Sequence, residues 1–163
     1  MSDNKERSVR KKFNIMFVCT GNTCRSPMAE FMFKAYLKDK KRGGDFAVSS
    51  AGLYAERGTK LTEEAHQALD VLGVDHNPER KARVFTVQMS KDADLVVTMT
   101  AEQARACGDN AVSFADITAN PVVDPFGASL GVYLETAMQI KNAFDDILAL
   151  CDEKRNRFAD VRN

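Results

Sequence analysis

The stretch "FNIMFVCTGNTCRSPMAEFMF" (13–33) joins a continuous apolar run to a tight turn and then to a second apolar segment. The run at 13–18 follows charged residues and ends at the turn, which predicts a strand buried on both faces. Pro27 suits the first turn of a helix, because that position needs no backbone N–H. Apolar side chains then recur at helical spacing, at Met28, Phe31, Met32 and Tyr36. We therefore predict a strand, a loop and a helix in succession.

The rest of the chain repeats this alternation. Further strands are predicted at 46–52, within 91–99 and at 111–117, and further helices at 61–73, 101–108 and 130–156. Thr62 is a suitable N-cap for the 61–73 helix, and Gly73 is a suitable residue to end it. Alternating strands and helices are typical of a parallel sheet covered on both faces. We therefore predict a three-layer α/β/α fold with a four-stranded parallel sheet.

The composition is that of an ordinary globular domain: 44% of the 163 residues are hydrophobic and 28% are charged. Lys plus Arg and Asp plus Glu number 23 each, so neither a nucleic acid nor a membrane would be attracted over the whole surface. No apolar run approaches the roughly 20 residues of a membrane span. Four cysteines are too few for a disulfide scaffold, which favours a reducing cytoplasm.

We predict a single domain at 13–163, preceded by a leader at 1–12. The leader, "MSDNKERSVRKK", is polar and lacks the apolar core of a secretion signal. It is predicted to be flexible, with a partly ordered extension of the first strand as the alternative. No internal repeat, low-complexity tract or linker divides the residues that follow.

The loop at 19–26 has the composition of an anion site. In parallel α/β folds, ligands bind at the carboxyl ends of the strands, where loops lead into helix N-termini. Backbone N–H groups of such a loop point at the anion, and the helix dipole adds to their field. Gly21 would let the loop curve, and Asn22 tolerates left-handed backbone better than most residues. Arg25 offers a planar fork of donors for bidentate binding of phosphate.

Cys19 is predicted to end the first strand and to face those donors. Groups that attract a phosphate also stabilise a thiolate, so Cys19 is a candidate nucleophile for phosphoryl transfer. Ser26 could donate a hydrogen bond to the thiolate. Five residues between Cys19 and Arg25 would form the cradle, and Arg25 would close it, which gives the Cys-x5-Arg spacing a mechanism.

Other interpretations of the cysteines are weaker. A zinc site needs further Cys or His ligands with paired spacing, and the remaining candidates are scattered, so no metal site is predicted. These candidates are His66, His76, Cys107 and Cys151. A purely structural loop would leave Arg25 unexplained. Cys24 either packs passively or traps an oxidised Cys19 as a disulfide, a choice that depends on the Cα separation. Cys107 and Cys151 fall in amphipathic helices and are expected in the core.

The segment "VCTGNTCRSPMAE" (18–30) resembles the phosphate loop of the low-molecular-weight protein tyrosine phosphatase family. "SSAG" after the second strand, "ADLVVTM" in the third and "DPFG" before the C-terminal helix extend the resemblance over most of the chain. The resemblance implies a flavodoxin-like fold and a phosphatase without a cofactor, in which Cys19 forms a phosphocysteine and Arg25 binds the substrate and stabilises the transition state. The loop and network that bind a phosphate or sulfate-type anion would comprise Thr20, Gly21, Asn22, Thr23, Cys24, Ser26 and Ser50.

The segment "NPVVDPFGAS" (120–129) supplies the candidate acid. Its prolines and glycine indicate irregular backbone, and Pro125 biases Asp124 away from helical geometry. From the residues alone, Asp-Pro is simply a turn. The resemblance implies that Asp124 is the general acid that protonates the leaving group and then activates water. Phe126 would form a wall of the substrate cleft, or else anchor the loop in the core, and Tyr54 would form another part of the wall.

Thr23 and Phe126 depart from the pattern of phosphotyrosine-specific members, which carry a bulkier aliphatic residue and a tyrosine at these places. The combination is more similar to the bacterial protein-arginine phosphatase branch. A hydroxyl at Thr23 could hydrogen-bond a guanidinium group or an attacking water, although Thr23 could also be loop filler. Some relatives have a histidine where Arg80 falls; Arg80 and Arg83, in "PERKAR" (78–83), are expected to be solvated.

The predicted function is therefore a cysteine-dependent protein phosphatase that acts on phosphorylated proteins, with phosphoarginine favoured and phosphotyrosine as the alternative. It needs no cofactor, and neither a nucleic acid nor a membrane is an expected partner. An arsenate reductase would need a relay of further cysteines, of which only Cys107 is near the expected region. A non-catalytic phosphoprotein-binding module would not need Cys19, Arg25 and Asp124 together.

Overall fold

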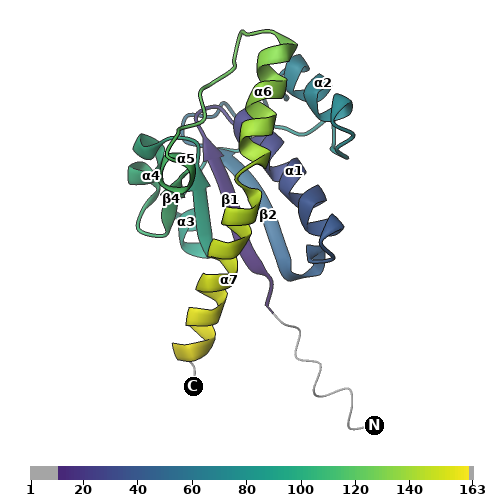
Figure 1. The fold of residues 1–163 in the computed structure, drawn as a ribbon. Coiled ribbons are helices and arrows are strands. Elements are labelled where there is room, and N and C mark those ends of the chain that lie inside the picture. The colour runs from purple at the N-terminus through teal and green to yellow at the C-terminus, as the bar shows by residue number, and fades with distance from the viewer. Residues whose placement is uncertain (1–10, 162–163) are drawn as a thin grey trace.

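A computed structural model describes residues 11–161 (Figure 1). Of the predicted leader, only Lys11 and Lys12 lie within the described residues. The sheet has four parallel strands in the order β2-β1-β3-β4. The strands are β1 (Phe13–Cys19), β2 (Phe46–Gly52), β3 (Leu95–Thr98) and β4 (Ala111–Ser113). The prediction of a four-stranded parallel sheet is confirmed.

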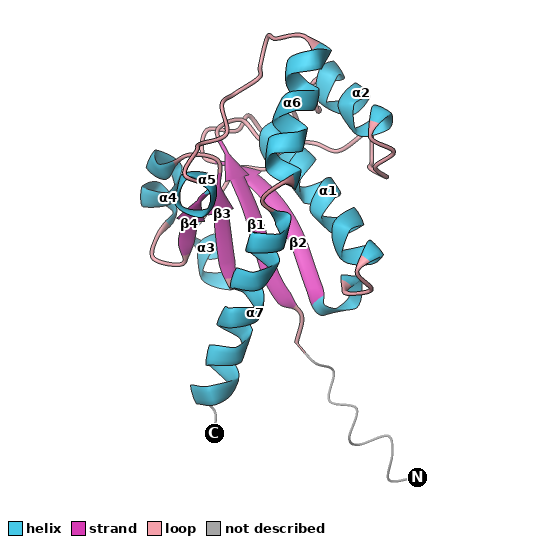
Figure 2. Cartoon of the chain, viewed as in Figure 1, coloured by secondary structure: helices cyan, strands magenta, loops and turns pink. Residues whose placement is uncertain are grey.

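Helices cover both faces of this sheet, as Figure 2 shows. They are α1 (Arg25–Asp39), α2 (Glu63–Val71), α3 (Val87–Asp92), α4 (Ala101–Cys107), α5 (Phe114–Thr118), α6 (Leu130–Lys141) and α7 (Phe144–Val161), with a 3-10 turn at Gly43–Asp45. Helices α1, α6 and α7 pack on one face, and α3 and α4 on the other. The three-layer prediction is therefore confirmed. Helix α2 lies at one end of the molecule, beside α1 and α6.

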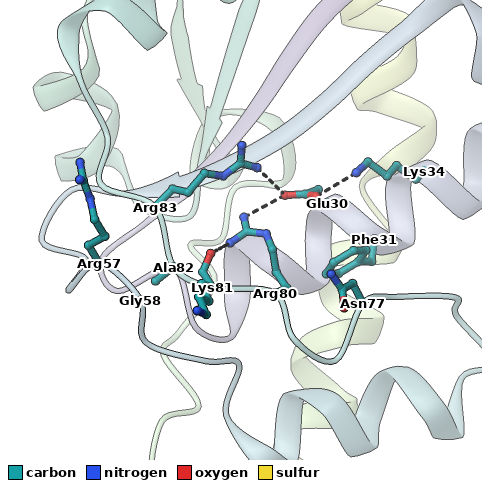
Figure 3. A pocket seen from close by; sticks show the side chains of 10 residues that line it. All are labelled: Glu30, Phe31, Lys34, Arg57, Gly58, Asn77, Arg80, Lys81, Ala82 and Arg83. Carbon is teal, nitrogen blue, oxygen red and sulfur yellow. Dashed lines mark hydrogen bonds and ion pairs between the residues drawn. The ribbon is translucent and has the colours of Figure 1, made fainter.

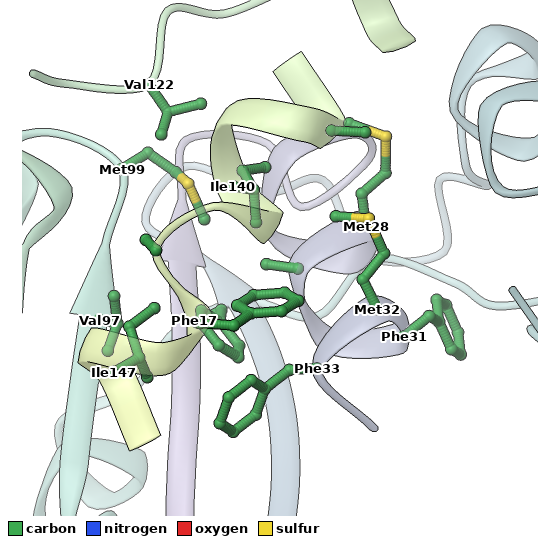
Figure 4. Packing of buried hydrophobic residues seen from close by; sticks show 14 of the residues in the cluster. Phe17, Met28, Phe31, Met32, Phe33, Val97, Met99, Val122, Ile140 and Ile147 are labelled. Carbon is green, nitrogen blue, oxygen red and sulfur yellow. The ribbon is translucent and has the colours of Figure 1, made fainter. Parts of the chain in front are cut away.

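Strand β1 is buried on both faces because its apolar side chains alternate between two cores. Ile15 and Phe17 point into the larger core, whereas Met16 and Val18 point into the smaller one. Figure 4 shows the larger core, where Phe17 meets side chains of β3, α1, α6 and α7. Those labelled there include Phe33, Val97, Ile140 and Ile147. The central place of β1 explains why its sequence is apolar without alternation.

The order of the strands fixes where a ligand can bind. Strand β1 pairs with β2 from Phe13↔Phe46 to Cys19↔Gly52, and with β3 from Ile15↔Leu95 to Val18↔Thr98. The chain thus leaves β1 for one side of the sheet and returns later to the other side. Ligands bind in the crevice at such a reversal, at the carboxyl ends of the strands. Cys19 is the last residue of β1 and lies at this crevice.

One of the predicted strands is shorter than expected. The strand predicted within 91–99 is found at Leu95–Thr98, directly after helix α3, which Thr86 caps. The strand predicted at 111–117 ends at Ser113, and its second half is helix α5. The Ser113 and Asp116 side chains form a reciprocal capping box there, which satisfies the first N–H groups of the helix.

The helix predicted at 130–156 is two helices. Helix α6 ends at Lys141, and α7 begins at Phe144 after a tight turn at 142–143. The apolar spacing continues across the break, since Ile140, Phe144 and Ile147 are all buried, and for this reason the periodicity alone predicts one helix. Within residues 11–161, no helix combines the length and the apolar character needed to cross a bilayer.

Candidate active site

The Cys19 sulfur lies at the floor of the loop between β1 and α1. The side chain is buried, and Sγ is 2.8 Å from the hydroxyl oxygen of Ser26. The backbone N–H of Asn22 donates to Sγ across 3.3 Å. Helix α1 begins at Arg25, so its N-terminus faces the same space. Hydrogen-bond donors and a helix dipole therefore converge on the sulfur, as a thiolate nucleophile requires.

The loop gets its curvature from Asn22 and its closeness to β2 from Gly52. Asn22 has a φ of 56°, in the left-handed region that the sequence predicts for it. Gly21 does not have a positive φ, and a Cβ there would meet only the Thr23 hydroxyl oxygen, at 3.7 Å. A Cβ at Gly52 would stand 2.6 Å from the Thr20 carbonyl oxygen and 2.9 Å from the Asn22 nitrogen. The glycine that the loop demands is therefore Gly52, rather than Gly21.

The Asn22 side chain holds the left-handed backbone by using all of its hydrogen-bonding capacity. Its amide nitrogen donates to the hydroxyls of Ser26, at 2.8 Å, and Ser50, at 3.0 Å. Its carbonyl oxygen accepts from the Arg80 guanidinium, at 3.1 Å, and from the backbone N–H of Arg83, at 2.9 Å. The predicted network of Asn22, Ser26 and Ser50 is thus assembled in space, and it also includes Arg80.

Arg80 contradicts the expectation that it is solvated. Only 11% of its side chain is exposed, against 50% for Arg83. Its guanidinium donates to the Ser50 hydroxyl at 2.7 Å. It also lies 3.1 Å from the carboxylate of Glu30, and Figure 3 shows this ion pair. The reason is that Glu30 on α1 is itself buried and needs a cationic partner. Neither partner of this ion pair is apparent from the sequence.

The groups around Glu30 lower the pKa of its carboxyl despite its burial. Burial would raise the pKa of the carboxyl, but the charge of Arg80 lowers it, and hydrogen bonds from Ser50 and Lys34 lower it further. The net result is a pKa below the ordinary value of 4.5. Glu30 is therefore ionised at neutral pH and fixes Arg80 against the loop.

Arg25 reaches from the start of α1 towards the loop at 120–129. The side chain is buried and donates to the Val122 carbonyl at 2.9 Å, and its other terminal nitrogen is 3.6 Å from the Asp124 carboxylate. Its Nε is buried without a hydrogen-bond partner among the described residues. A phosphate held by the loop could accept from this group, as bidentate recognition by arginine requires.

Asp124 lies at the mouth of the cradle, where the sequence places the acid. Its carboxylate accepts from the Phe126 backbone N–H at 3.1 Å and from the Cys24 thiol at 3.6 Å. The buried Val122, whose N–H donates to the Met99 carbonyl, anchors the loop that carries it. About half of the side chain remains exposed, so it can contact a substrate.

The Cys24 thiol donates to the Asp124 carboxylate and is close enough to Cys19 to feel its charge. Burial, the neighbouring Cys19 and Asp124 raise its pKa to about 12, although Arg25 opposes them. Cys24 is therefore a neutral thiol at physiological pH. Cys107 and Cys151 are buried in helices, as expected, and burial raises their pKa values to about 11 and about 12.

The two aromatic residues assigned to the cleft are both exposed. Tyr54, 84% exposed, lines the cleft beside Arg25 and Asp124. Phe126 is 71% exposed, so the alternative that it anchors the loop in the core is wrong. Thr23 is half-buried, and its carbonyl accepts from the Thr62 N–H at the start of α2, at 3.0 Å.

Glu102 and Gln103 of α4 are further cleft residues that the sequence analysis missed. The Gln103 amide donates to the Thr20 hydroxyl at 3.0 Å and so braces the loop from the side of β3. Its oxygen also accepts from the backbone N–H of Met99 and of Thr100. Thr100 followed three positions later by Gln103 is a capping-box signature, which could have identified this residue as structural.

The arrangement as a whole can bind a tetrahedral oxyanion and transfer its central group to sulfur. The loop and Arg25 provide donors, Cys19 provides a nucleophile within them, and Asp124 provides a carboxyl at the mouth. These are the parts that phosphoryl transfer requires: positioning, charge stabilisation and proton transfer.

Comparison with known proteins agrees with this chemistry. Residues 14–157 match the family described as low molecular weight phosphotyrosine protein phosphatase. A protein-arginine-phosphatase of Bacillus subtilis is 33% identical over 138 residues, which cover 78% of this chain and 89% of that protein. The low molecular weight protein-tyrosine-phosphatase PtpB of Staphylococcus haemolyticus is 35% identical over 135 residues, covering 77% and 91%. Among solved structures, a YwlE arginine phosphatase mutant with a phosphorylated active site serine has a TM-score of 0.79 at 30% identity, covering 88% of this chain and 99% of that one.

Proposed function

The chain belongs to the low molecular weight phosphotyrosine protein phosphatase family of cysteine-dependent phosphatases, and we propose that it removes phosphate from arginine side chains of proteins. We further propose that Cys19 is the nucleophile, Arg25 the phosphate-binding group and Asp124 the general acid. Their convergence at the end of β1 supports this assignment. The related YwlE mutant with a phosphorylated active site serine supports a phosphoenzyme intermediate.

The reaction has two steps. First, the Cys19 thiolate attacks phosphorus, the bond from phosphorus to the leaving nitrogen breaks, and Asp124 protonates that nitrogen. Second, water attacks the phosphocysteine, Asp124 accepts a proton from it, and inorganic phosphate and the thiolate are released. Arg25 and the loop N–H groups stabilise the oxygens of the transferred group in both transition states.

The residues that line the cleft beside Arg25 are the reason for proposing phosphoarginine as the substrate. Two acidic side chains line it, Asp124 from the 120–129 loop and Glu102 from α4. A guanidinium group has several N–H donors and a positive charge, whereas a phenyl ring has neither. The carboxylate of Glu102, which takes no part in the proton transfer, therefore favours an arginine derivative over a tyrosine derivative. Tyr54 also lines this cleft, and its exposed ring could stack on the plane of a guanidinium group.

Thr23 adds to this preference. Its hydroxyl lies next to Gly21 at the rim of the loop, where it can hydrogen-bond the guanidinium or the attacking water. An aliphatic side chain there could only contact a ring. The protein-arginine-phosphatase of Bacillus subtilis and the tyrosine phosphatase PtpB are about equally identical to this chain, so the proposal depends on Glu102 in the cleft and on Thr23.

The alternatives fit the site less well. Phosphotyrosine hydrolysis would use the same catalytic residues and is the second candidate. For an arsenate reductase, the Cys107 thiol would have to exchange disulfides, but it is buried and its pKa is raised to about 11. A module that only binds phosphoproteins would not need a thiol at the floor of the cradle together with a carboxyl at its mouth.

Rates on two peptides of one sequence, carrying phosphoarginine or phosphotyrosine, test the proposal. We expect a higher kcat/KM for phosphoarginine in the wild type. Thr23→Ile should move the ratio towards phosphotyrosine by about tenfold, equivalent to roughly 1.4 kcal/mol of differential transition-state binding. Thr59→Ile, at an exposed threonine away from the cleft, is the matched control and should leave the ratio unchanged.

Two outcomes separate the parts of the proposal. A wild type that prefers phosphotyrosine, with a ratio that Thr23→Ile does not move, would exclude the arginine assignment but not the phosphatase chemistry. Normal turnover of an aryl phosphate by Cys19→Ser would exclude the nucleophile assignment itself.

A further inference from the structure

The two histidines of the chain touch each other, away from the catalytic loop. His66 lies on α2, and His76 lies in the segment that follows it. His66 Nδ1 and His76 Nε2 are 2.6 Å apart, and the ring centroids are 4.8 Å apart. Their ten-residue spacing does not suggest this contact. It arises because α2 ends at Val71 and Gly73, just beyond it, has a φ of 68° that turns the chain back along the helix.

Asp70 completes a group of three potential ligands. It lies one helical turn after His66 on α2, so both side chains project from one face of the helix. Its carboxylate oxygens are 3.8 Å from His66 Nε2 and 3.8 Å from His76 Nε2. One ligand atom from each of the three residues lies within 4.8 Å of the other two.

His76 is held in the orientation that a metal ligand needs. Its Nδ1–H donates to the Val74 carbonyl at 2.8 Å, since a carbonyl can only accept. With Nδ1 engaged in this way, Nε2 is the ring nitrogen that faces His66 and Asp70, and in the neutral ring it would offer its lone pair to a cation. Only 3% of the side chain is exposed, and the ring packs against Phe31. A carbonyl behind the ring that fixes its tautomer is typical of histidine metal ligands.

We propose that His66, Asp70 and His76 bind a divalent transition metal ion of the Zn²⁺ class. Two imidazoles and one carboxylate are a ligand set that favours Zn²⁺ over the oxygen-preferring Mg²⁺ and Ca²⁺. Asp70 is 62% exposed, so the site opens to solvent and water can fill the fourth position. Nitrogens of two histidines on one tetrahedral Zn²⁺ stand roughly 3.3 Å apart, so binding requires the rings to move apart from their 2.6 Å contact, which the partly exposed His66 side chain is free to do.

The cation would join α2 to the segment that leads to Arg80. Helix α2 starts beside the catalytic loop, where the Thr62 N–H donates to the Thr23 carbonyl. Four residues after His76, Arg80 enters the Asn22 network. The proposed site is therefore a structural clamp across two segments that brace the loop, and it takes no part in phosphoryl transfer.

Calorimetric titration of the full chain with ZnCl₂ tests the site. The chain should carry no histidine tag, and Cys19 and Cys24 should be replaced by serine, because thiolates also bind Zn²⁺. We expect one ion per chain. At a free concentration one hundred times the Kd, the melting temperature should rise by about 5–10 °C. His66→Asn, at a partly exposed position, should weaken binding at least about tenfold. Asp75→Asn, next to His76 but outside the group, is the matched control and should bind as the parent does.

Imidazole NMR gives a second readout that does not depend on stability. Because the chain has only two histidines, both rings should shift on addition of Zn²⁺, and His66→Asn should abolish the shift of the remaining ring. The proposal would be overturned by an absence of binding up to millimolar Zn²⁺. It would equally be overturned by binding that His66→Asn leaves unchanged.

Discussion

The guanidinium of Arg80 donates a hydrogen bond to the side-chain oxygen of Asn22 across 58 positions of the sequence, at 3.1 Å. Asn22 has left-handed backbone and donates its own N–H to the Cys19 sulfur. The conformation of the Cys19 loop therefore depends on contacts from the segment at 80–83. We expect Arg80 to act as a positioning residue.

Arg80→Ala should lower kcat for an aryl phosphate by at least about tenfold, roughly 1.4 kcal/mol of transition-state stabilisation, with a smaller change in KM. The reason is that Asn22 loses a partner while Arg25 still binds phosphate. Steady-state kinetics measure both parameters. Arg83→Ala is the matched control, because its side chain is half exposed, and it should stay close to wild type. Unchanged kcat in a folded Arg80→Ala or Arg80→Lys protein would contradict the positioning role.

Glu30→Gln should destabilise the protein at neutral pH by about 3 kcal/mol, because Arg80 stays buried without its counter-charge. The pKa of Glu30 is lower in the folded chain than its ordinary 4.5. Between these two values the unfolded chain binds more protons, so stability rises with pH there. The contribution of Glu30 is fully present above pH 4.5 and is lost as the pH falls through the folded value.

Urea unfolding of wild type and Glu30→Gln at several pH values checks this prediction. The gap between their free energies of unfolding should be large at pH 7 and should narrow below pH 4.5. Glu56→Gln, at an exposed position, should show a small gap at every pH. A gap of equal size at pH 4 and pH 7 would mean that ionisation of Glu30 does not stabilise the fold.

Gly52→Ala should destabilise the protein by about 1–3 kcal/mol and reduce turnover, because the new methyl group would overlap the Thr20 carbonyl. Thermal unfolding and aryl phosphate turnover measure the two effects. Gly44→Ala is the control, since nothing lies within 4 Å of a Cβ there, and its stability should change by less than about 1 kcal/mol. Full activity in Gly52→Ala would show that the loop does not need this close approach.

Cys24→Ser should make oxidation by hydrogen peroxide harder to reverse. Peroxide converts the Cys19 thiolate to a sulfenic acid, and the Cys24 thiol can then condense with it, releasing water and forming a disulfide that dithiothreitol reduces. Without Cys24, further oxidation of Cys19 is irreversible. Activity recovered after peroxide and then dithiothreitol should therefore be high in the wild type and low in the variant. Equal recovery would assign Cys24 to packing alone.

The sequence predicts most of the fold because the apolar residues, spaced as in strands and helices, are the residues that are buried in the core. The strands at 13–18 and 46–52 and the helix after Pro27 are found where the pattern places them. The errors lie where hydrogen bonds of one or two side chains override that pattern. Ser113 starts a helix inside an apolar run, and the turn at 142–143 interrupts a helix without interrupting its apolar face.

The residues of the site likewise fall into those that the sequence predicts and those that it does not. Cys19, Asn22 and Arg25 are close together in sequence, so their spacing alone predicts a cradle. Arg80 resembles a solvated charge in sequence, because nothing local shows that Glu30 is buried 50 positions away. Gln103 is 83 positions from the Thr20 hydroxyl that it braces. Contacts of this kind depend on tertiary packing, which periodicity does not record.

The strand order also has a consequence for the growing polypeptide. Residues 13–52 contain β1, α1 and β2, and β1 pairs with β2 from Phe13↔Phe46 to Cys19↔Gly52, so the strand that carries Cys19 has its first partner early in synthesis. The loop that carries Asp124 is synthesised much later. On the ribosome, the loop around the sulfur would be braced only after Arg80 and Gln103 have been made, and the Asp124 carboxyl would arrive later still. In refolding, we expect β-sheet circular dichroism to recover before turnover, because activity needs the segment at 120–129 to dock.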